Sequence, residues 1–281
     1  MTDTSPCDRG RARKGAAIEP ASAHHITVQG SANAKVVVEV AVDSLAGARA
    51  AAHAGADRLE VCSSLAEGGL TPSLGLFEAV RAAVQLPIFA MVRPRGGDFL
   101  YDDDDFDIML RDLRLLRGAG ADGIVSGALV AAGGLDEARL AELVARTHPL
   151  PFTCHRAFDL CADPAAAIET LVQVGAARVL TSGQAPSAPA GAPAIARHVA
   201  AAGSRLVVMA GAGVRDDNIR PLVAATGVRE VHLSAGVWRA SGMRFQRRGV
   251  RMGPSAPPEE HSWRATDGTL VAAVVEALRR H

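Results

Sequence analysis

Residues 35–62 read KVVVEVAVDSLAGARAAAHAGADRLEVC and contain the unit from which the fold is built. The apolar run 36–42 predicts a buried strand, and the Ala-rich segment 45–54 predicts a helix. Gly55-Ala56-Asp57 then turns the chain into a second strand over 58–62. A strand, a helix and a parallel strand form the right-handed crossover unit of α/β proteins. The stretch therefore predicts a parallel sheet covered by helices.

The same unit recurs to the end of the chain. Further strands are predicted at 88–93, 123–125, 152–158, 178–181, 206–210 and 230–233. Helices are predicted at 75–84, 106–119, 136–146, 164–174, 193–202, 217–225 and 270–280. Eight strand–helix units predict a closed (β/α)8 TIM barrel over residues 35–281, and a doubly wound open sheet is the alternative.

Two segments lack a helix or strand period. Residues 1–34 mix Ser, Pro, Ala, Gly and charged residues, so they are predicted to be a disordered N-terminal tail. The Arg-, Gly- and Pro-rich segment 238–263 is predicted to be a long excursion at the mouth of the barrel, where it would be an oligomer contact or a lid.

Composition narrows the class of partner. The chain has 30 basic and 30 acidic residues and only 4% aromatic residues, so neither a net positive field nor a stacking surface favours nucleic acid or an anionic membrane. No apolar run approaches the ~20 residues that span a bilayer, and the N-terminus lacks the apolar core of a signal peptide. We therefore expect an intracellular protein that binds small molecules or ions, with its four cysteines reduced.

Ionisable side chains follow several of the predicted strands. Because the outer face of a barrel strand is covered by apolar helices, these side chains are expected to point inward. The inward set is Glu39, Glu60, Arg93, His155 and His232, and the further candidates Arg95 and Arg156 would hold anionic groups. They would either neutralise one another as a buried ion-pair network or support proton transfer, with the carboxylates and histidines as acids and bases and the arginines holding negative charge.

Glycine-containing turns after strands six to eight are a second signal. Approachable backbone N–H groups and hydroxyls at these strand ends are where barrels commonly bind phosphate. The candidate anion-binding residues are Ser182, Gly183, Gly211, Gly213 and Ser234.

Metal ligation has a weaker pattern. Cu(I) prefers soft ligands, and Cys62, Met91, Cys154, His155 and His232 are expected near the same end of the barrel, but no two of them have the spacing of a binding loop. The acidic run 102–107 directly precedes a helix, so it is predicted to cap that helix rather than to bind a hard cation.

Several of these motifs together resemble the CutC family of copper homeostasis proteins. The resemblance covers residues 36–281 and is carried by the Glu39 strand, 60–73 (EVCSSLAEGGLTPS), 93–99 (RPRGGDF), 155–159 (HRAFD), 180–183 (LTSG), 209–214 (MAGAGV) and 231–235 (VHLSA). It implies a cytoplasmic, homo-oligomeric TIM barrel that handles copper, with Cys62 as the copper ligand.

Two functions follow from the sequence. The first is that of a CutC-like protein, namely to bind and handle Cu(I) through Cys62. The second is a TIM-barrel hydrolase, isomerase or lyase that acts on a small anionic substrate, such as a phosphorylated metabolite, through the Glu/Arg/His cluster. Cys62→Ser should impair the first and Glu60→Gln the second.

Overall fold

The structure is a computed structural model that describes Met1 and residues 35–247, 249–250 and 260–279, so the predicted tail lies outside the described residues. Eight strands alternate with helices along the chain. They are β1 (Val37–Val42), β2 (Arg58–Val61), β3 (Ile88–Met91), β4 (Gly123–Ser126), β5 (Phe152–Cys154), β6 (Arg178–Thr181), β7 (Val207–Gly211) and β8 (Glu230–Leu233).

The helices follow the strands as predicted. They are α1 (Leu45–His53), α2 (Leu74–Ala83), α3 (Asp103–Gly118), α4 (Glu137–Thr147), α5 (Pro164–Gln173), α6 (Ala192–Ala202), α7 (Ile219–Thr226) and α8 (Gly268–Arg279). Two 3₁₀ turns, η1 (Leu65–Glu67) and η2 (Arg156–Leu160), lie in loops after strands. None of the described helices has the length and apolar character needed to cross a membrane.

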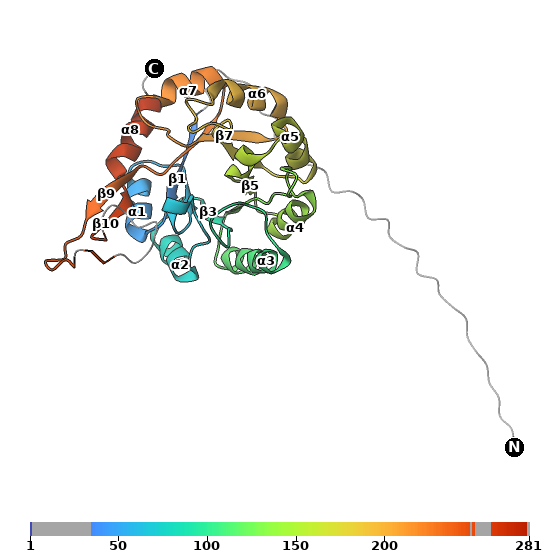
Figure 1. The fold of residues 1–281 in the computed structure, drawn as a ribbon, viewed down its shortest axis with the longest axis horizontal. Coiled ribbons are helices and arrows are strands. Elements are labelled where there is room, and N and C mark those ends of the chain that lie inside the picture. The colour runs from blue at the N-terminus through green and yellow to red at the C-terminus, as the bar shows by residue number, and fades with distance from the viewer. Residues whose placement is uncertain (2–34, 248, 251–259, 280–281) are drawn as a thin grey trace. The chain divides into compact units, whose positions relative to one another are not determined.

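All eight strands pair in parallel, and the sheet closes because β1 pairs with both β2 and β8. Figure 1 shows the helices as a ring around the strands. The predicted TIM barrel is therefore confirmed, and the open-sheet alternative is wrong, since an open sheet would leave β1 and β8 without this mutual pairing.

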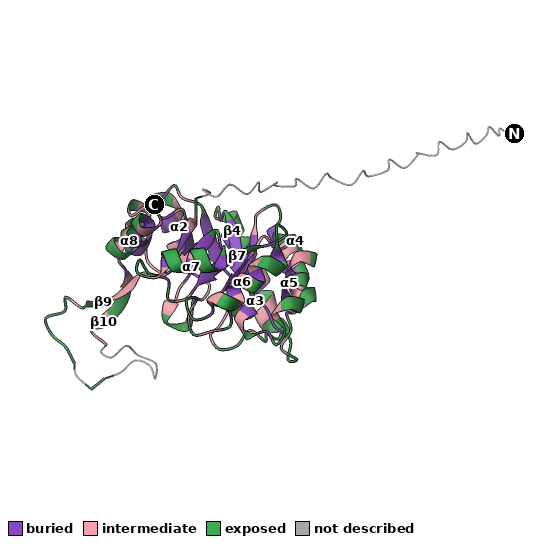
Figure 2. Ribbon diagram, turned by 90° about the horizontal axis from the view of Figure 1, so that it is seen from above, coloured by how far each residue is buried: buried purple, intermediate pink, exposed green. Residues whose placement is uncertain are grey.

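Side chains alternate along each strand, so one set packs between the barrel and the helices and the other set fills the barrel interior. On β1, Val38, Val40 and Val42 face outward and pack in the large core between barrel and helices, whereas Glu39 faces inward. Figure 2 shows the buried strands inside helices whose outer faces are exposed. The polar side chains on the inward faces of the strands form the candidate site.

The interior near the amino-terminal ends of the strands holds a buried ion-pair network. Arg58, the first residue of β2, donates from Nε to Glu39 and from Nη2 to Glu230. Arg178, the first residue of β6, lies 3.1 Å from the same Glu230 carboxylate. Both guanidinium groups lie over the ring of Phe89, with centroid distances of 4.7 and 5.0 Å.

Two predicted segments differ from the structure. The strand predicted over 152–158 is wrong beyond Cys154, because the side chain of His155 accepts a hydrogen bond from Ala157 N and starts the turn η2. The segment 238–263 had no predicted period, yet its ends form an antiparallel ribbon of β9 (Gly236–Ala240) and β10 (Ser262–Thr266) that projects from the barrel in Figure 1. By contrast, the acidic run caps α3 as predicted, since Asp102 accepts from Asp105 N.

Breaking the buried network is predicted to be costly. In Arg58→Met, Glu39 and Glu230 would remain buried without their shared cation, so we expect the free energy of unfolding to fall by about 3–5 kcal/mol. Urea denaturation at neutral pH measures this loss. The matched control is Arg205→Met, which breaks a solvent-screened pair with Glu169 and should change the free energy of unfolding far less. Equal losses in the two variants would contradict a structural role for the network.

Candidate functional site

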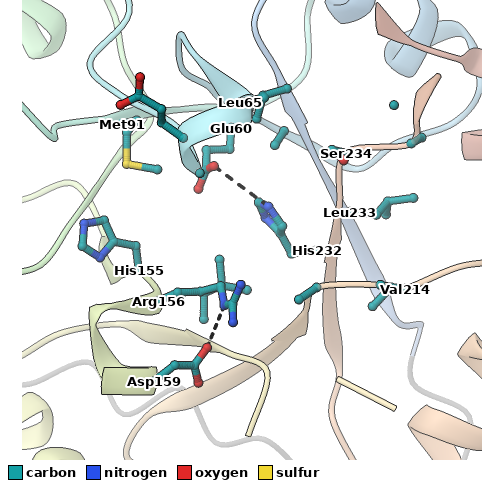
Figure 3. Close-up of a pocket in the computed structure, with 18 of the residues that line it drawn as sticks. Glu60, Leu65, Met91, His155, Arg156, Asp159, Val214, His232, Leu233 and Ser234 are labelled. Atoms are coloured by element: carbon teal, nitrogen blue, oxygen red, sulfur yellow. Dashed lines mark hydrogen bonds and ion pairs between the residues drawn. The ribbon is translucent and has the colours of Figure 1, made fainter. Parts of the chain in front are cut away.

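A cavity of about 660 Å³ opens at the carboxyl ends of the barrel strands. Glu60, Met91 and His155 line one part of its wall, and Val214 and Ser234 line another. In the view of Figure 3 these two groups lie on opposite sides, with His232 and Arg156 between them. The carboxyl end of the barrel is where TIM-barrel proteins place their chemistry, so this cavity is the candidate active site.

A chain of three side chains leads from the ion-pair network to the cavity. Glu39 Oε1 lies 2.8 Å from His232 Nδ1, and His232 Nε2 lies 4.0 Å from Glu60 Oε1 (Figure 3). The other oxygen of Glu39 accepts from Arg58. The sequence thus places Glu39, Glu60 and His232 on inward faces of β1, β2 and β8, and the closed sheet brings them together.

The members of this chain hold protons differently. Burial alone would raise the pKa of Glu39, but the hydrogen bond from His232 and the charge of Arg58 outweigh it and lower this pKa to about 2. Burial also opposes charge on His232, yet the carboxylates of Glu60 and Glu39 raise its pKa above the ordinary value. The two carboxylates therefore favour the charged form of His232, which Glu39 contacts directly.

Glu60 has the opposite balance. Burial is the largest effect and raises its pKa from 4.5 to about 7, because the charge of His232 only partly offsets the loss of water. Glu60 Oε2 is buried and has no hydrogen-bond partner among the described residues. A carboxyl group with a pKa near 7 exchanges a proton readily at neutral pH, which suits a general acid or base.

His155 is a neutral donor that faces the same cavity. Its Nδ1 accepts a hydrogen bond of 3.2 Å from Ala157 N, so the proton of the neutral ring is on Nε2. Burial, reinforced by the charge of Arg93, lowers the pKa of His155 to about 3. Nε2 is buried without a partner in the described part of the chain, which leaves one N–H group without an acceptor beside the cavity.

The two arginines after β3 have different positions. Arg93 is 4% exposed, lines the cavity and donates to the carbonyls of Glu67, Gly69 and Gly97. Arg95 does not line the cavity. Its guanidinium pairs with Asp105 at 2.8 Å and lies over the ring of Tyr101, so it holds the loop instead.

The turn after β6 already holds a carboxylate of this chain. Asp159 accepts hydrogen bonds from Ser182 N and Oγ and from Gln184 N, and Arg156 Nε lies 2.7 Å from its Oδ2. Gly183 packs against the backbone of Gly191, away from the cavity. The predicted donors of Ser182 are therefore satisfied internally, while Arg156 lines the cavity beside Asp159.

The turns after β7 and β8 are placed differently. Gly213 and Ser234 line the cavity. Gly211 does not line it, because it packs beneath the ring of His232, where an added Cβ would lie 3.2 Å from that residue's Cβ. Of the five predicted anion-binding residues, Gly213 and Ser234 thus face the cavity.

The thiols lie in apolar surroundings. Cys62 is fully buried with Phe89, Met91 and Val125 inside the barrel, and burial raises the pKa of its thiol far above the ordinary value. A Cβ on Gly69 would lie 3.3 Å from Met91 Cε and 3.5 Å from Cys62 Sγ, so both sulfur side chains pack against the same glycine. Cys154 faces outward into the core beneath the helices.

Glu39, Glu60 and His232 are also the one group of described side chains with the geometry of a metal site, with donor atoms within 4.8 Å of one another. Oxygen and imidazole donors suit a divalent ion better than Cu(I). Both Glu39 oxygens are engaged by Arg58 and His232, so the group fits proton sharing better than metal ligation.

The sequence analysis missed Asp159 and the ion-pair partners Arg58, Arg178 and Glu230. Alternation offered a signal for two of them, since Arg58 lies two residues before Glu60 and Glu230 two before His232. Asp159 carried no such signal, because it was assigned to the region just beyond a strand and its partners come from the next turn.

Comparisons with known proteins agree on one family. The family model of the CutC family matches residues 36–237. The copper homeostasis protein cutC homolog of Homo sapiens is 46% identical over 92% of this chain and 95% of the human protein. A family protein CutC of Klebsiella pneumoniae is 48% identical over 84% of this chain and 95% of its own length. The crystal structure of a CutC protein from Streptococcus agalactiae matches with a TM-score of 0.68 and 29% identity, over 71% of this chain and 98% of that one.

The raised pKa of Glu60 predicts a pH-dependent gain in stability for Glu60→Gln. The folded state holds the Glu60 proton more tightly than the unfolded state, so this residue costs stability as pH rises from 4.5 to about 7. At pH 8 we expect the free energy of unfolding of Glu60→Gln to exceed that of the parent protein by about 3 kcal/mol. At pH 4 we expect the two proteins to be equally stable. Urea denaturation at both pH values measures the difference. The exposed pair of Glu142 with Arg146 supplies the control Glu142→Gln, and a gain for Glu60→Gln that does not change with pH would contradict the assignment.

Proposed function

The chain belongs to the CutC family of copper homeostasis proteins, and we propose that its barrel cavity carries out acid–base chemistry on a small anionic molecule. The observation that carries this proposal is the pair of buried, unpartnered groups on one cavity wall, Glu60 Oε2 and His155 Nε2. A carboxylate that accepts a proton and an N–H group that donates a hydrogen bond are the two parts that proton transfer requires.

The steps follow from the protonation states. Ionised Glu60 takes a proton from a C–H or O–H group of the bound molecule, and the electron pair left behind moves to a substrate oxygen. The N–H group of neutral His155 and the guanidinium of Arg156 stabilise the negative charge on that oxygen. The protonated Glu60 then returns the proton to another substrate atom, or to a leaving group. Isomerisation and carbon–carbon cleavage share this proton transfer.

His232 and Glu39 act behind Glu60. The His232 cation lies between the two carboxylates, so it keeps the pKa of Glu60 from rising further under burial. Glu39 and Arg58 hold the imidazole in place. This arrangement supports a base that is ionised at the upper end of the neutral range and protonated below it.

Glu60→Gln is predicted to remove turnover. Loss of a general base lowers rates by about 10²–10⁴-fold, and in the parent protein kcat/KM should rise with pH through about 7 and then level off. The assay follows a mixture of small phosphorylated and carboxylated metabolites by NMR, first with the parent protein. Glu142→Gln is the matched control and should retain full activity. Turnover that survives in Glu60→Gln, or no turnover of any anionic metabolite, would contradict the proposal.

Cu(I) binding is the second candidate function. The observation that favours it is the packing of Cys62 and Met91 against the same glycine, which brings two soft sulfur ligands to one place inside the barrel. The family name also supports it. The raised pKa of the Cys62 thiol opposes it, because the thiolate is the ligand and the thiol must lose its proton to bind.

A Cu(I) titration of reduced protein against a competing chelator tests this candidate. The copper proposal predicts one Cu(I) per chain at this site, lost in Cys62→Ser and weakened in Met91→Leu. Cys154→Ser is the matched control, since it removes a buried thiol on the outer face of the barrel wall and should leave binding unchanged. Binding that is equal in all three variants would rule out a site at Cys62.

A further inference from the structure

We propose that the part of the cavity wall contributed by the ends of β7 and β8 and by β10 binds the phosphate group of a small phosphorylated substrate. This inference rests on the acid–base function proposed above and names the substrate class. It is carried by the charge of the described barrel interior, by the groups on this wall and by the occupied turn after β6.

The described barrel interior holds more positive than negative charge. Its acids are Glu39, Glu60 and Glu230, and its cations are Arg58, Arg93, Arg178 and the protonated His232. With every carboxylate ionised the three arginines balance the three acids, and the raised pKa of His232 favours a further positive charge at the cavity end. Burying an uncompensated charge is costly, so an anion that enters the cavity would be favoured.

Arg93 is the cation without an acidic partner. Its hydrogen bonds go to neutral carbonyl groups, and its buried Nε has no partner among the described residues. Every other guanidinium of the interior is paired with a carboxylate. The excess charge therefore lies on the cavity side of the interior rather than in the network beneath it.

The wall of β7, β8 and β10 supplies the groups that a phosphate recognises. Arg215, after β7, and Arg264, on β10, line the cavity, and Arg156 of η2, which the proposed mechanism places at the reacting oxygen, lines it as well. Arg215 is mostly exposed, and its nearest acidic group is Asp217 at 3.7 Å. Arg264 donates to Gly236 O at 2.8 Å, which keeps its guanidinium at the start of β9, just beyond β8. Cationic side chains of this kind form charge-assisted hydrogen bonds with phosphate oxygens.

Backbone groups complete this wall. Gly213 has a φ of +72°, and within the described residues no acceptor takes the N–H groups of Gly213 or Val214. Successive N–H groups at a glycine turn form a concave anion site, and Ser234 adds a hydroxyl on the neighbouring strand end. The loops after strands seven and eight are also where barrels commonly hold phosphate.

The turn after β6 cannot provide the same site. Asp159 already accepts the N–H groups of Ser182 and Gln184, as a phosphate oxygen would. Because this carboxylate occupies the turn after β6, an anion would bind at the wall of β7 and β8 instead. The same carboxylate pairs with Arg156, which lies at the cavity. With the phosphate on this wall, the rest of the substrate would extend toward Glu60 and His155 on the other side (Figure 3).

Inorganic phosphate is the probe for this subsite. Isothermal titration of the full chain at pH 8 and constant ionic strength should give saturable binding of one phosphate, with chloride as the competing ion. Arg215→Gln removes an exposed side chain on a loop, so it should fold normally and weaken phosphate binding about tenfold. The control Arg205→Gln removes an equal charge that pairs with Glu169 outside the cavity, and it should bind as the parent protein does.

The outcomes separate this proposal from the acid–base function. Glu60→Gln should retain phosphate binding, so loss of turnover together with retained binding supports both proposals. Phosphate binding without any Glu60-dependent turnover would sink the function and leave the subsite in place. Equal binding by the parent, Arg215→Gln and Arg205→Gln proteins would overturn the subsite.

A carboxylate site at Arg93 is the competing arrangement. If malonate binds more tightly than phosphate, and this binding is weakened by Arg93→Gln but not by Arg215→Gln, the anion belongs at Arg93 and the proposal is wrong. Arg93 also holds loop carbonyls, so the melting temperature of Arg93→Gln is measured beside the titration. If that variant does not fold, the comparison of phosphate with malonate in the Arg215→Gln protein alone decides between the two sites.

Discussion

The two oxygens of one buried carboxylate, Glu39, connect the stability of this barrel to its chemistry. One oxygen accepts from Arg58, which also binds Glu230 at the base of the barrel, and the other lies 2.8 Å from His232 at the cavity. A fully buried carboxylate must have such partners, because a lone charge would be too costly in this interior. The base of the barrel and the floor of the site are therefore one network. A change that seems only structural at Arg58 would reach His232 through a single side chain.

The same network explains why Glu60 differs from Glu39. Both carboxylates are buried, yet Glu39 has two strong donors and a pKa of about 2, whereas Glu60 has His232 at 4.0 Å and a pKa of about 7. Hydrogen bonds and nearby charges decide the first case, and loss of water decides the second. Two carboxylates whose pKa values differ in this way are suited to separate roles, which is why the proposed mechanism gives the proton exchange to Glu60 alone. His155 lines the same cavity with a lowered pKa, and its Nδ1 accepts from Ala157 N, so the proton of the neutral ring is on Nε2.

The turns predicted to bind an anion show how tertiary contacts give similar sequences different surroundings. The turns after β6, β7 and β8 all contain glycine, and those after β6 and β8 also contain serine. Asp159 fills the first, Gly211 packs beneath His232, and Gly213 and Ser234 remain on the cavity wall. Tertiary contacts also give different surroundings to Arg93 and Arg95, although the two residues are only two positions apart in the sequence. One faces the cavity, and the other turns outward to Asp105 and the ring of Tyr101.

The sequence by itself determined the barrel, the order of its elements and the inward faces that carry Glu39, Glu60 and His232. Those features depend on local periods and on strand alternation, which are written in neighbouring residues. It also determined the family, because several motifs match together. The tertiary structure alone decided which polar groups meet, since β1 and β8 lie at opposite ends of the sequence and only their pairing brings Glu39 to His232. Closure of the sheet also decided the protonation of Glu60, because burial and charge depend on neighbours far away in the chain.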